Sequence, residues 1–296
     1  RYQCIMDKFN KVTAVIVLYN VSDIIFECLK NLKNIKIIII DNGYNNPAII
    51  KKIKLNKNII KFFSLKKNIG FGRACNFAFK YTKTEYTLLI EPDVLIKEID
   101  IQRLINGLQK YPDAAIVAPT LINKKNSIID SLENLPELNF KEDNLISPKA
   151  NNYENKNIIS GDVCVHFCWA AVLLLNNKII KKTGLFNKKI FIFWEDFFLS
   201  RKLKKLKKPI IKIFSSRALH LEGKSTVSSI KSRFIINKHH ILSAYIYRNV
   251  KKNDKILIKK MFIYFFRFIS YLFILNLKNS LKNLAKLCAV ISYKNS

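Results

Sequence analysis

Short apolar runs alternate with helix-like spacing over the first 120 residues of the chain. The runs are almost continuously apolar, which is typical of strands buried on both faces of a sheet. Between them apolar residues recur at helical spacing, for example from Ile24 to Leu32 behind a capping Ser22. The pattern predicts an α/β fold: a mostly parallel sheet with helices on both faces. The predicted strands are residues 12–18, 36–40, 59–64, 86–90 and 114–118.

The second half of the chain has a different pattern. A polar, irregular stretch (123–160) is followed by strand-like residues (161–175), a helix (196–206) and a strand (210–214). Beyond them the pattern is helical to the end. Because composition and periodicity change there, we expect an α/β domain followed by a helical C-terminal extension. The predicted boundaries are residues 10–228 and 229–296.

Residues 261–277 are strongly apolar and aromatic, with lysines on both sides. Arg267, Ser270 and Asn276 interrupt the run, whereas a membrane-spanning helix needs about 20 mostly apolar residues. We therefore expect a basic amphipathic segment lying in a membrane interface. An ordinary buried helix and a true span remain as alternatives.

The chain carries 52 Lys or Arg residues against 21 Asp or Glu, a formal charge of +31. Many lysines are interspersed with Asn and Ile, so one interpretation is a composition bias with solvated lysines. The other is attraction to an anionic partner such as a membrane surface or a nucleotide. We expect no nucleic-acid partner, because no zinc finger and no arginine-rich stripe is present.

Six cysteines are scattered without a C-x-x-C pair, which favours a reducing compartment over a disulfide framework. Cys164 and Cys168 have even spacing on a predicted strand, so both are expected to pack into the core. Residues 1–10 contain no apolar segment typical of a signal peptide. Together these features predict a cytoplasmic location.

Two aspartates follow predicted strands directly, at the end where parallel sheets bind ligands. Asp41 can accept hydrogen bonds from a base or ribose, or it can simply form a turn before Asn42-Gly43. Residues 68–76 contain two glycines and an arginine at a predicted helix start. That arrangement suits a phosphate, although a plain strand-to-helix turn has the same pattern.

Glu91 and Asp93 flank Pro92 after the fourth predicted strand. Hard cations such as Mg²⁺ and Mn²⁺ take carboxylate oxygens together with substrate phosphates, so a metal site is one interpretation. A helix-capping Asp is the other. His220 can add a ligand if the chain folds back to this place, and is otherwise a structural residue.

Glu195 and Asp196 begin a predicted helix beside aromatic residues. Partial desolvation by those rings would raise the pKa of a carboxylate, which suits a general base. The alternative is an acidic pair that is favoured at a helix start by the helix dipole. The neighbouring aromatic residues are Phe191, Phe193, Trp194 and Phe197.

Read in order, seven segments resemble a bacterial family 2 glycosyltransferase of the rhamnosyltransferase-like branch. They extend from residue 15 to residue 225, in the family's order and at similar spacing. Each motif is modest, and the ordered set is specific. The segments are VIVLYN (15–20), IIDNG (39–43), NIGFGRACN (68–76), PD (92–93), GLF (184–186), FIFWED (191–196) and HLEGKS (220–225).

The resemblance implies a GT-A (Rossmann-like) fold that binds a nucleotide-diphosphate sugar and inverts the anomeric centre. It implies a divalent cation, Mg²⁺ or Mn²⁺, held by Asp93 with His220, and Asp196 as the base for the acceptor hydroxyl. The acceptor would be a saccharide or a lipid-linked sugar, and the enzyme would act at the inner face of the cell membrane in surface-polysaccharide synthesis. The residues expected at the donor are Asp41, Asn20, Gly70, Arg73 and Asn76.

Some residues depart from the family pattern. Glu91 stands where relatives have Asp or Asn, Tyr44 where they have Ser or Thr, and Asn187 where they have an acidic residue. Two other functions are considered. A nucleotidyltransferase would need a glycine-rich basic loop after the first strand, and residues 19–21 do not supply one. A non-enzymatic membrane or nucleic-acid binding protein is the second alternative. Asp196→Ala separates it from a transferase, which should lose its activity and still bind the nucleotide sugar.

Overall fold

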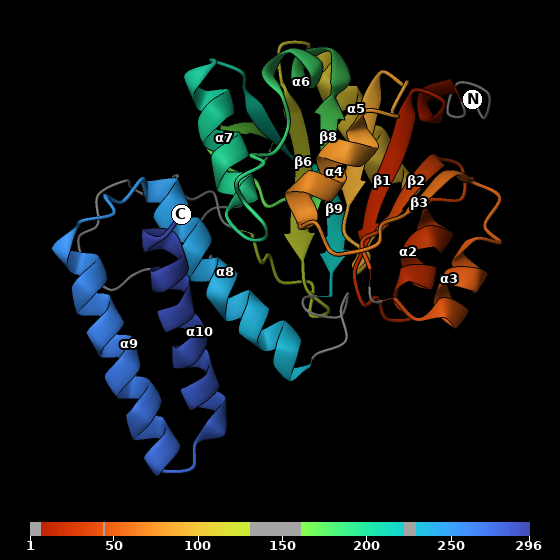
Figure 1. Cartoon of the computed structure of the whole chain (residues 1–296). Coiled ribbons are helices and arrows are strands. Elements are labelled where there is room, and N and C mark those ends of the chain that lie inside the picture. The colour runs from red at the N-terminus through yellow and green to blue at the C-terminus, as the bar shows by residue number, and fades with distance from the viewer. Residues whose placement is uncertain (1–6, 44, 131–160, 222–228) are drawn as a thin grey trace. The chain divides into compact units, whose positions relative to one another are not determined.

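The computed structural model describes residues 7–43, 45–130, 161–221 and 229–296. These residues form two compact units (Figure 1). The first unit contains the described residues up to 130, together with 161–187 and 195–221. The second contains 188–194 and 229–296. Each unit is described by itself below.

The first unit is built on one sheet of nine strands in the order β3-β2-β1-β4-β8-β6-β9-β5, with β7 beside β9. Pairing is parallel from β3 through β4 and between β6 and β9, whereas β8, β5 and β7 pair antiparallel. The strands are β1 Val12–Leu18, β2 Lys36–Asp41, β3 Ile59–Ser64, β4 Tyr86–Ile90, β5 Val94–Ile96, β6 Ile116–Ile122, β7 Asp162–Val165, β8 Val172–Asn176 and β9 Ile210–His220.

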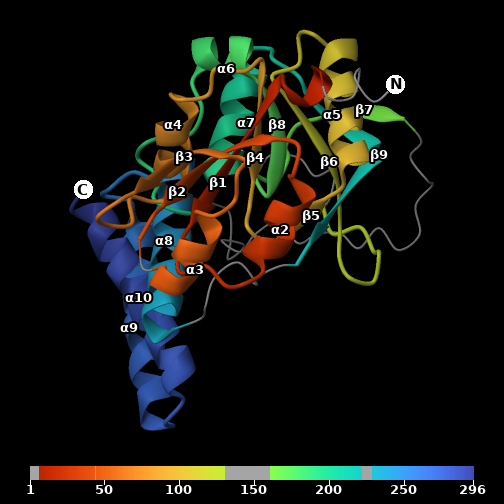
Figure 2. The same cartoon turned by 90° about the vertical axis from the view of Figure 1, so that its right-hand side faces the viewer.

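Helices cover both faces of this sheet (Figures 1 and 2). Successive side chains of a strand point to opposite faces, so the apolar runs supply two cores. In β1, Ile16 packs into one core and Val17 into the other. The first core also takes residues from α2 Ile25–Asn31, α3 Pro47–Ile53 and α5 Glu98–Lys110, and the second from α4 Phe71–Phe79, α6 Asn177–Thr183 and α7 Glu195–Lys205.

The predicted α/β fold class is confirmed, and the differences from it are local. Parallel pairing dominates only the N-terminal half of the sheet. Helix α2 begins at Ile25, with Ile24 rather than Ser22 in the N-cap position. Cys164 is exposed on β7, and the buried Cys168 lies in the loop after that strand, so the two do not share one core face.

Three helices form most of the second unit: α8 Ile230–Arg248, α9 Lys255–Phe273 and α10 Leu277–Lys294. Ser229 and Ser232 form a capping box at the start of α8. Helix α9 ends at Phe273, so residues 261–277 are a helix end, a turn and a new helix start. Among the described residues, no helix is long and apolar enough to cross a bilayer.

Candidate active site

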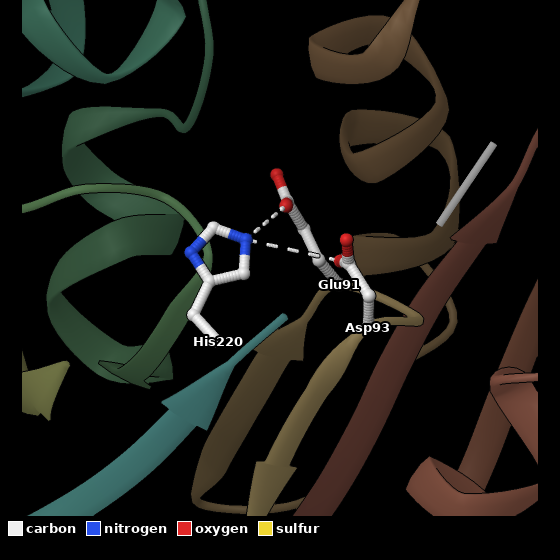
Figure 3. Close-up of side chains that lie close together, drawn as sticks. All are labelled: Glu91, Asp93 and His220. Atoms are coloured by element: carbon white, nitrogen blue, oxygen red, sulfur yellow. Dashed lines mark ion pairs between the residues drawn. The ribbon is translucent and has the colours of Figure 1, made fainter. Parts of the chain in front are cut away.

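A cluster of two carboxylates and an imidazole lies at the carboxyl end of β4 (Figure 3). The Nε2 atom of His220 is 3.6 Å from Oε2 of Glu91 and 3.8 Å from Oδ1 of Asp93. One ligand atom from each residue lies within 4.8 Å of the others. From the sequence, His220 could join Asp93 only if the chain folds back to that place. The structure shows that it does.

The short strand β5 is what brings His220 to the carboxylates. Glu91 follows β4 directly, and Asp93 precedes β5, which pairs antiparallel with the end of β9 so that Val94 lies opposite His220. The amide of Leu221 donates to the carbonyl of Asp93 at 3.0 Å. A three-residue strand and the extension of β9 beyond residue 214 gave no clear signal in the sequence.

The donor set of this cluster fits a hard divalent cation. Two carboxylates that close together repel each other, and Asp93 is only 1% exposed, so a cation would offset charges that water cannot screen. Cys28 donates its thiol to the carbonyl of Glu91 at 3.9 Å. Burial, and then the charge of Asp93, raises the pKa of Cys28 to about 12. The thiol therefore stays protonated and is a poor metal ligand.

Glu195 and Asp196 form the first turn of α7, and both have raised pKa values. Burial raises the pKa of Asp196 to about 7, opposed by backbone N–H groups that include the amide of Phe197, which donates to Oδ1 at 2.8 Å. Burial, and then the charge of Asp196, raises the pKa of Glu195 to about 8. The charge of Glu91 raises the pKa of both carboxyl groups, so they lie within electrostatic reach of the cluster of Glu91, Asp93 and His220.

The residues just before this pair adopt an uncommon backbone conformation. Phe193 and Trp194 have φ values of 64° and 69°, in the left-handed region that bulky residues rarely occupy. Contacts inside the second unit hold them there. The hydroxyl of Ser243 donates to the carbonyl of Ile192 at 2.9 Å, and the guanidinium of Arg248 lies 4.9 Å from the centre of the Trp194 ring.

The four aromatic residues near the acidic pair divide between the two units. Phe191, Phe193 and Trp194 contact helix α8, through ring contacts with His239, His240 and Tyr247. Only Phe197, which stacks on Phe167, belongs to the first unit together with the carboxylates.

The carboxyl ends of β1, β2 and β4 lie along one edge of the sheet, because these strands pair in parallel. Asp41 ends β2 there, and its Oδ1 accepts hydrogen bonds from Nδ2 of Asn45 at 2.6 Å and from the amide of Gly43 at 3.1 Å. Asn45 in turn accepts from the amide of Val21 at 2.8 Å. Asn20 lies two residues past β1 with a φ of 46°, which Asn tolerates. Sequence reasoning did not identify Asn45 as the residue that orients Asp41.

The turn into α4 is organised by side-chain amides. Gly70 has a φ of 91° and donates its amide to Oδ1 of Asn68 at 2.8 Å. Asn42 donates to the same atom at 2.9 Å and accepts from the amide of Ile69 at 3.0 Å. Arg73 follows on the exposed side of the first turn of α4.

The side-chain amide of Asn76 is hydrogen-bonded to the backbone of Phe186. Its Nδ2 donates to the carbonyl of Phe186 at 2.9 Å, and its Oδ1 accepts from the Phe186 amide at 3.0 Å. The side chain therefore fixes residues 184–186 against α4. Tyr44 and residues 222–225, which carry part of the resemblance and of its departures, lie outside the described residues.

Replacing Asn76 by Ala is expected to lower the free energy of unfolding by about 1–3 kcal/mol, because two backbone groups of Phe186 lose their partner. Urea unfolding measures the effect. Asn31→Ala, which removes a solvent-exposed hydrogen bond to the carbonyl of Glu27, is the control and should change stability by about 0.5 kcal/mol or less. Wild-type stability combined with lost donor binding would instead make Asn76 a direct donor contact.

Comparison with known proteins gives the class of the molecule. The family described as Glycosyl transferase family 2 matches residues 13–175, more than half of the chain. The chain therefore belongs to glycosyl transferase family 2. A poly-beta-1,6-N-acetyl-D-glucosamine synthase of Staphylococcus aureus (strain MSSA476) is 28% identical over 138 residues, which cover 44% of this chain and 33% of that protein. The chain thus matches only about a third of that relative.

Solved structures share the fold at low sequence identity. A GalNAc-T7 structure with UDP, GalNAc and Mn²⁺ superposes with a TM-score of 0.57 at 13% identity, covering 80% of this chain and 48% of that one. A mannosyltransferase from Pyrobaculum calidifontis, in complex with GDP-Man and Mn²⁺, gives 0.53 at 11% identity and covers 96% and 73%. These likenesses confirm the predicted GT-A fold.

Proposed function

We propose that this chain is a metal-dependent, inverting glycosyltransferase. It moves a sugar from a nucleotide-diphosphate donor to a hydroxyl group of a saccharide or of a lipid-linked acceptor, in the synthesis of a cell-surface polysaccharide. The observation that carries the proposal is the cluster of Glu91, Asp93 and His220 within electrostatic reach of Asp196, in a chain of family 2. In this proposal the cluster would hold the diphosphate of the donor through a cation, and Asp196 takes up the proton of the acceptor.

The donor lies across the carboxyl ends of β1, β2 and β4 in this proposal. Asp41, oriented by Asn45, accepts hydrogen bonds from the base or the ribose. Asn20, Gly70 and Arg73 line the same end of the sheet, where the start of α4 and a cationic side chain favour phosphate oxygens. Asp93 and His220 would hold a divalent cation, which supplies neutralisation of the leaving diphosphate.

Asp196 then acts as the general base. Its carboxylate removes the proton from the acceptor hydroxyl, and the oxygen attacks the anomeric carbon from the face opposite the diphosphate. The bond between that carbon and the diphosphate oxygen breaks, so the configuration inverts. A pKa raised to about 7 suits this role, because the group is ionised near neutral pH and still basic.

The proposed place of action is the inner face of the cell membrane, where a lipid-linked acceptor would be found. Rhamnose is the donor sugar that the sequence resemblance suggests. The solved relatives hold other donors or sugars, among them GalNAc and GDP-mannose, so the donor has to be identified by experiment.

A panel of nucleotide sugars, each tested by thermal unfolding with and without Mn²⁺, is expected to yield a donor that stabilises the protein only when Mn²⁺ is present. Binding to the native state adds about 2.7 kcal/mol at a hundredfold excess over Kd, which is readily seen as a rise in Tm. The free sugars serve as controls, because they lack the diphosphate. A donor that stabilises equally in EDTA would contradict the role of Asp93 and His220.

A further inference from the structure

The outer side of α9 carries large apolar side chains that remain exposed in the described part of the chain. Their positions recur at intervals of three, four and seven residues, so they form one stripe of about 120° around the helix. The opposite stripe, with Leu257 and Tyr264, is buried. The exposed positions are Ile258 (45%), Phe262 (58%), Phe265 (46%), Phe266 (63%), Leu272 (43%) and Phe273 (82%).

The turn between α9 and α10 continues this surface. Ile274, Leu275 and Leu277 are 69%, 82% and 66% exposed. The two helices lie side by side as a hairpin, with the hydroxyl of Ser280 donating to the carbonyl of Phe268 at 3.2 Å, and the turn forms its tip (Figure 1). We call the stripe and the turn together the outer face. Exposed apolar residues scattered singly are ordinary, whereas a continuous patch marks an interaction site.

The positive charge around the outer face indicates which kind of partner it binds. Residues 229–296 contain fourteen Lys or Arg and a single acidic residue, Asp254. Lys255, Lys259, Lys278 and Lys282 are all exposed on α9 and α10. A second copy of the chain would bring the same positive charge against it. An anionic surface would instead be attracted.

We propose that the outer face docks this chain on an anionic lipid bilayer. The apolar side chains enter the boundary between headgroups and acyl chains, and the lysines contact acidic headgroups. The helix lies in the interface and does not cross it. This proposal rests on the proposed function only for its purpose, which is access to a lipid-linked acceptor; the binding itself is independent of catalysis.

Co-sedimentation of the full chain with vesicles tests the surface. The protein is expected to bind vesicles of phosphatidylcholine with phosphatidylglycerol at least roughly tenfold more tightly than vesicles of phosphatidylcholine alone, with a loss of binding at high salt. Equal binding to both kinds of vesicle would overturn the part of the proposal that assigns the lysines.

Phe273→Ser combined with Leu275→Ser is expected to weaken binding to the anionic vesicles roughly tenfold or more, because two apolar contacts with the bilayer are lost. Both side chains are 82% exposed, so the fold should tolerate the change. Leu55→Ser, at a 76% exposed position of the first unit, is the matched control and should bind like the wild type. Unchanged binding of the double variant would overturn the outer face as the membrane contact.

Two further measurements separate the possible outcomes. Sedimentation velocity without lipid should show a monomer; a dimer that the double variant disrupts, without vesicle binding, would make a second copy the partner and contradict the proposal. Transfer to a soluble acceptor should be the same in the double variant and the wild type. If no transfer is found but the anionic vesicles are bound, the proposed function fails and the docking surface stands.

Discussion

Asp196→Asn is expected to lower kcat for sugar transfer by roughly 10²–10⁴-fold while leaving donor binding intact, because the amide cannot take up the acceptor proton. Asn keeps the size of the side chain, and its Oδ1 can still accept from the amide of Phe197, as the carboxylate does at 2.8 Å. The loss is therefore chemical rather than structural. Initial rates with saturating donor and Mn²⁺, together with donor-induced thermal stabilisation, measure the two properties separately.

Glu195→Gln is the matched control. Glu195 is buried beside Asp196, and its Oε2 has no hydrogen-bond partner within the described residues. Burial raises the pKa of both carboxyl groups, and the charge of Asp196 raises that of Glu195 further, which favours a protonated Glu195 beside an ionised Asp196. A glutamine resembles that protonated acid, and kcat should stay within a few-fold of the wild type.

The pH dependence of kcat also distinguishes the two carboxyl groups. The base must be ionised, so kcat should fall as the pH drops below the pKa of Asp196, about 7. Glu195→Gln should retain that acid limb, since Asp196 is still the group that has to be ionised. If instead Glu195→Gln abolished transfer and Asp196→Asn did not, the two carboxyl groups would have to exchange roles.

Three strands of the N-terminal half, β1, β2 and β4, could be predicted because they are buried on both faces over almost their whole length. β1 and β4 begin and end where the apolar runs do, and β2 extends one residue further, to Asp41. The edge strand β3 is only partly buried, and its run contains Lys61 and Ser64. Burial on both faces requires apolar residues at every position, so strand limits are visible in the sequence. The antiparallel strands were less visible. β5 has three residues, and the end of β9 is polar and only partly buried.

The same contrast applies to the site. Asp41 and Asp93 could be placed because the carboxyl ends of parallel strands meet at one edge. The position of His220 depends on the β5–β9 pairing, which is a contact between segments far apart in the chain. The partner of Asn76 is Phe186, which lies far away in the chain. The partner of Asp41 is Asn45, whose position depends on the turn between them. The left-handed backbone at Phe193 and Trp194 depends on helix α8, which follows much later in the sequence.

Asp93→Asn is expected to abolish the Mn²⁺-dependent stabilisation by the donor and to lower the transfer rate by roughly 100-fold or more. An amide oxygen carries no formal charge, so it binds a divalent cation far more weakly than a carboxylate does. The fold without metal should not lose stability through charge, because the substitution removes repulsion between Asp93 and Glu91, whose ligand atoms lie within 4.8 Å. Thermal unfolding across a Mn²⁺ titration measures both effects.

Asp100→Asn controls for the loss of any buried aspartate. Asp100 is 5% exposed, pairs with Arg103 at 2.8 Å and is not one of the three residues of the cluster, so this variant should lose stability but keep the full Mn²⁺ response. Glu91→Gln should weaken the Mn²⁺ response by only about tenfold. The Glu91 side chain is 32% exposed, so solvent already screens its charge. An Asp93→Asn variant that still required Mn²⁺ for transfer at the wild-type concentration would place the cation elsewhere. The cluster of Glu91, Asp93 and His220 would then be an electrostatic feature of the fold and not the metal site.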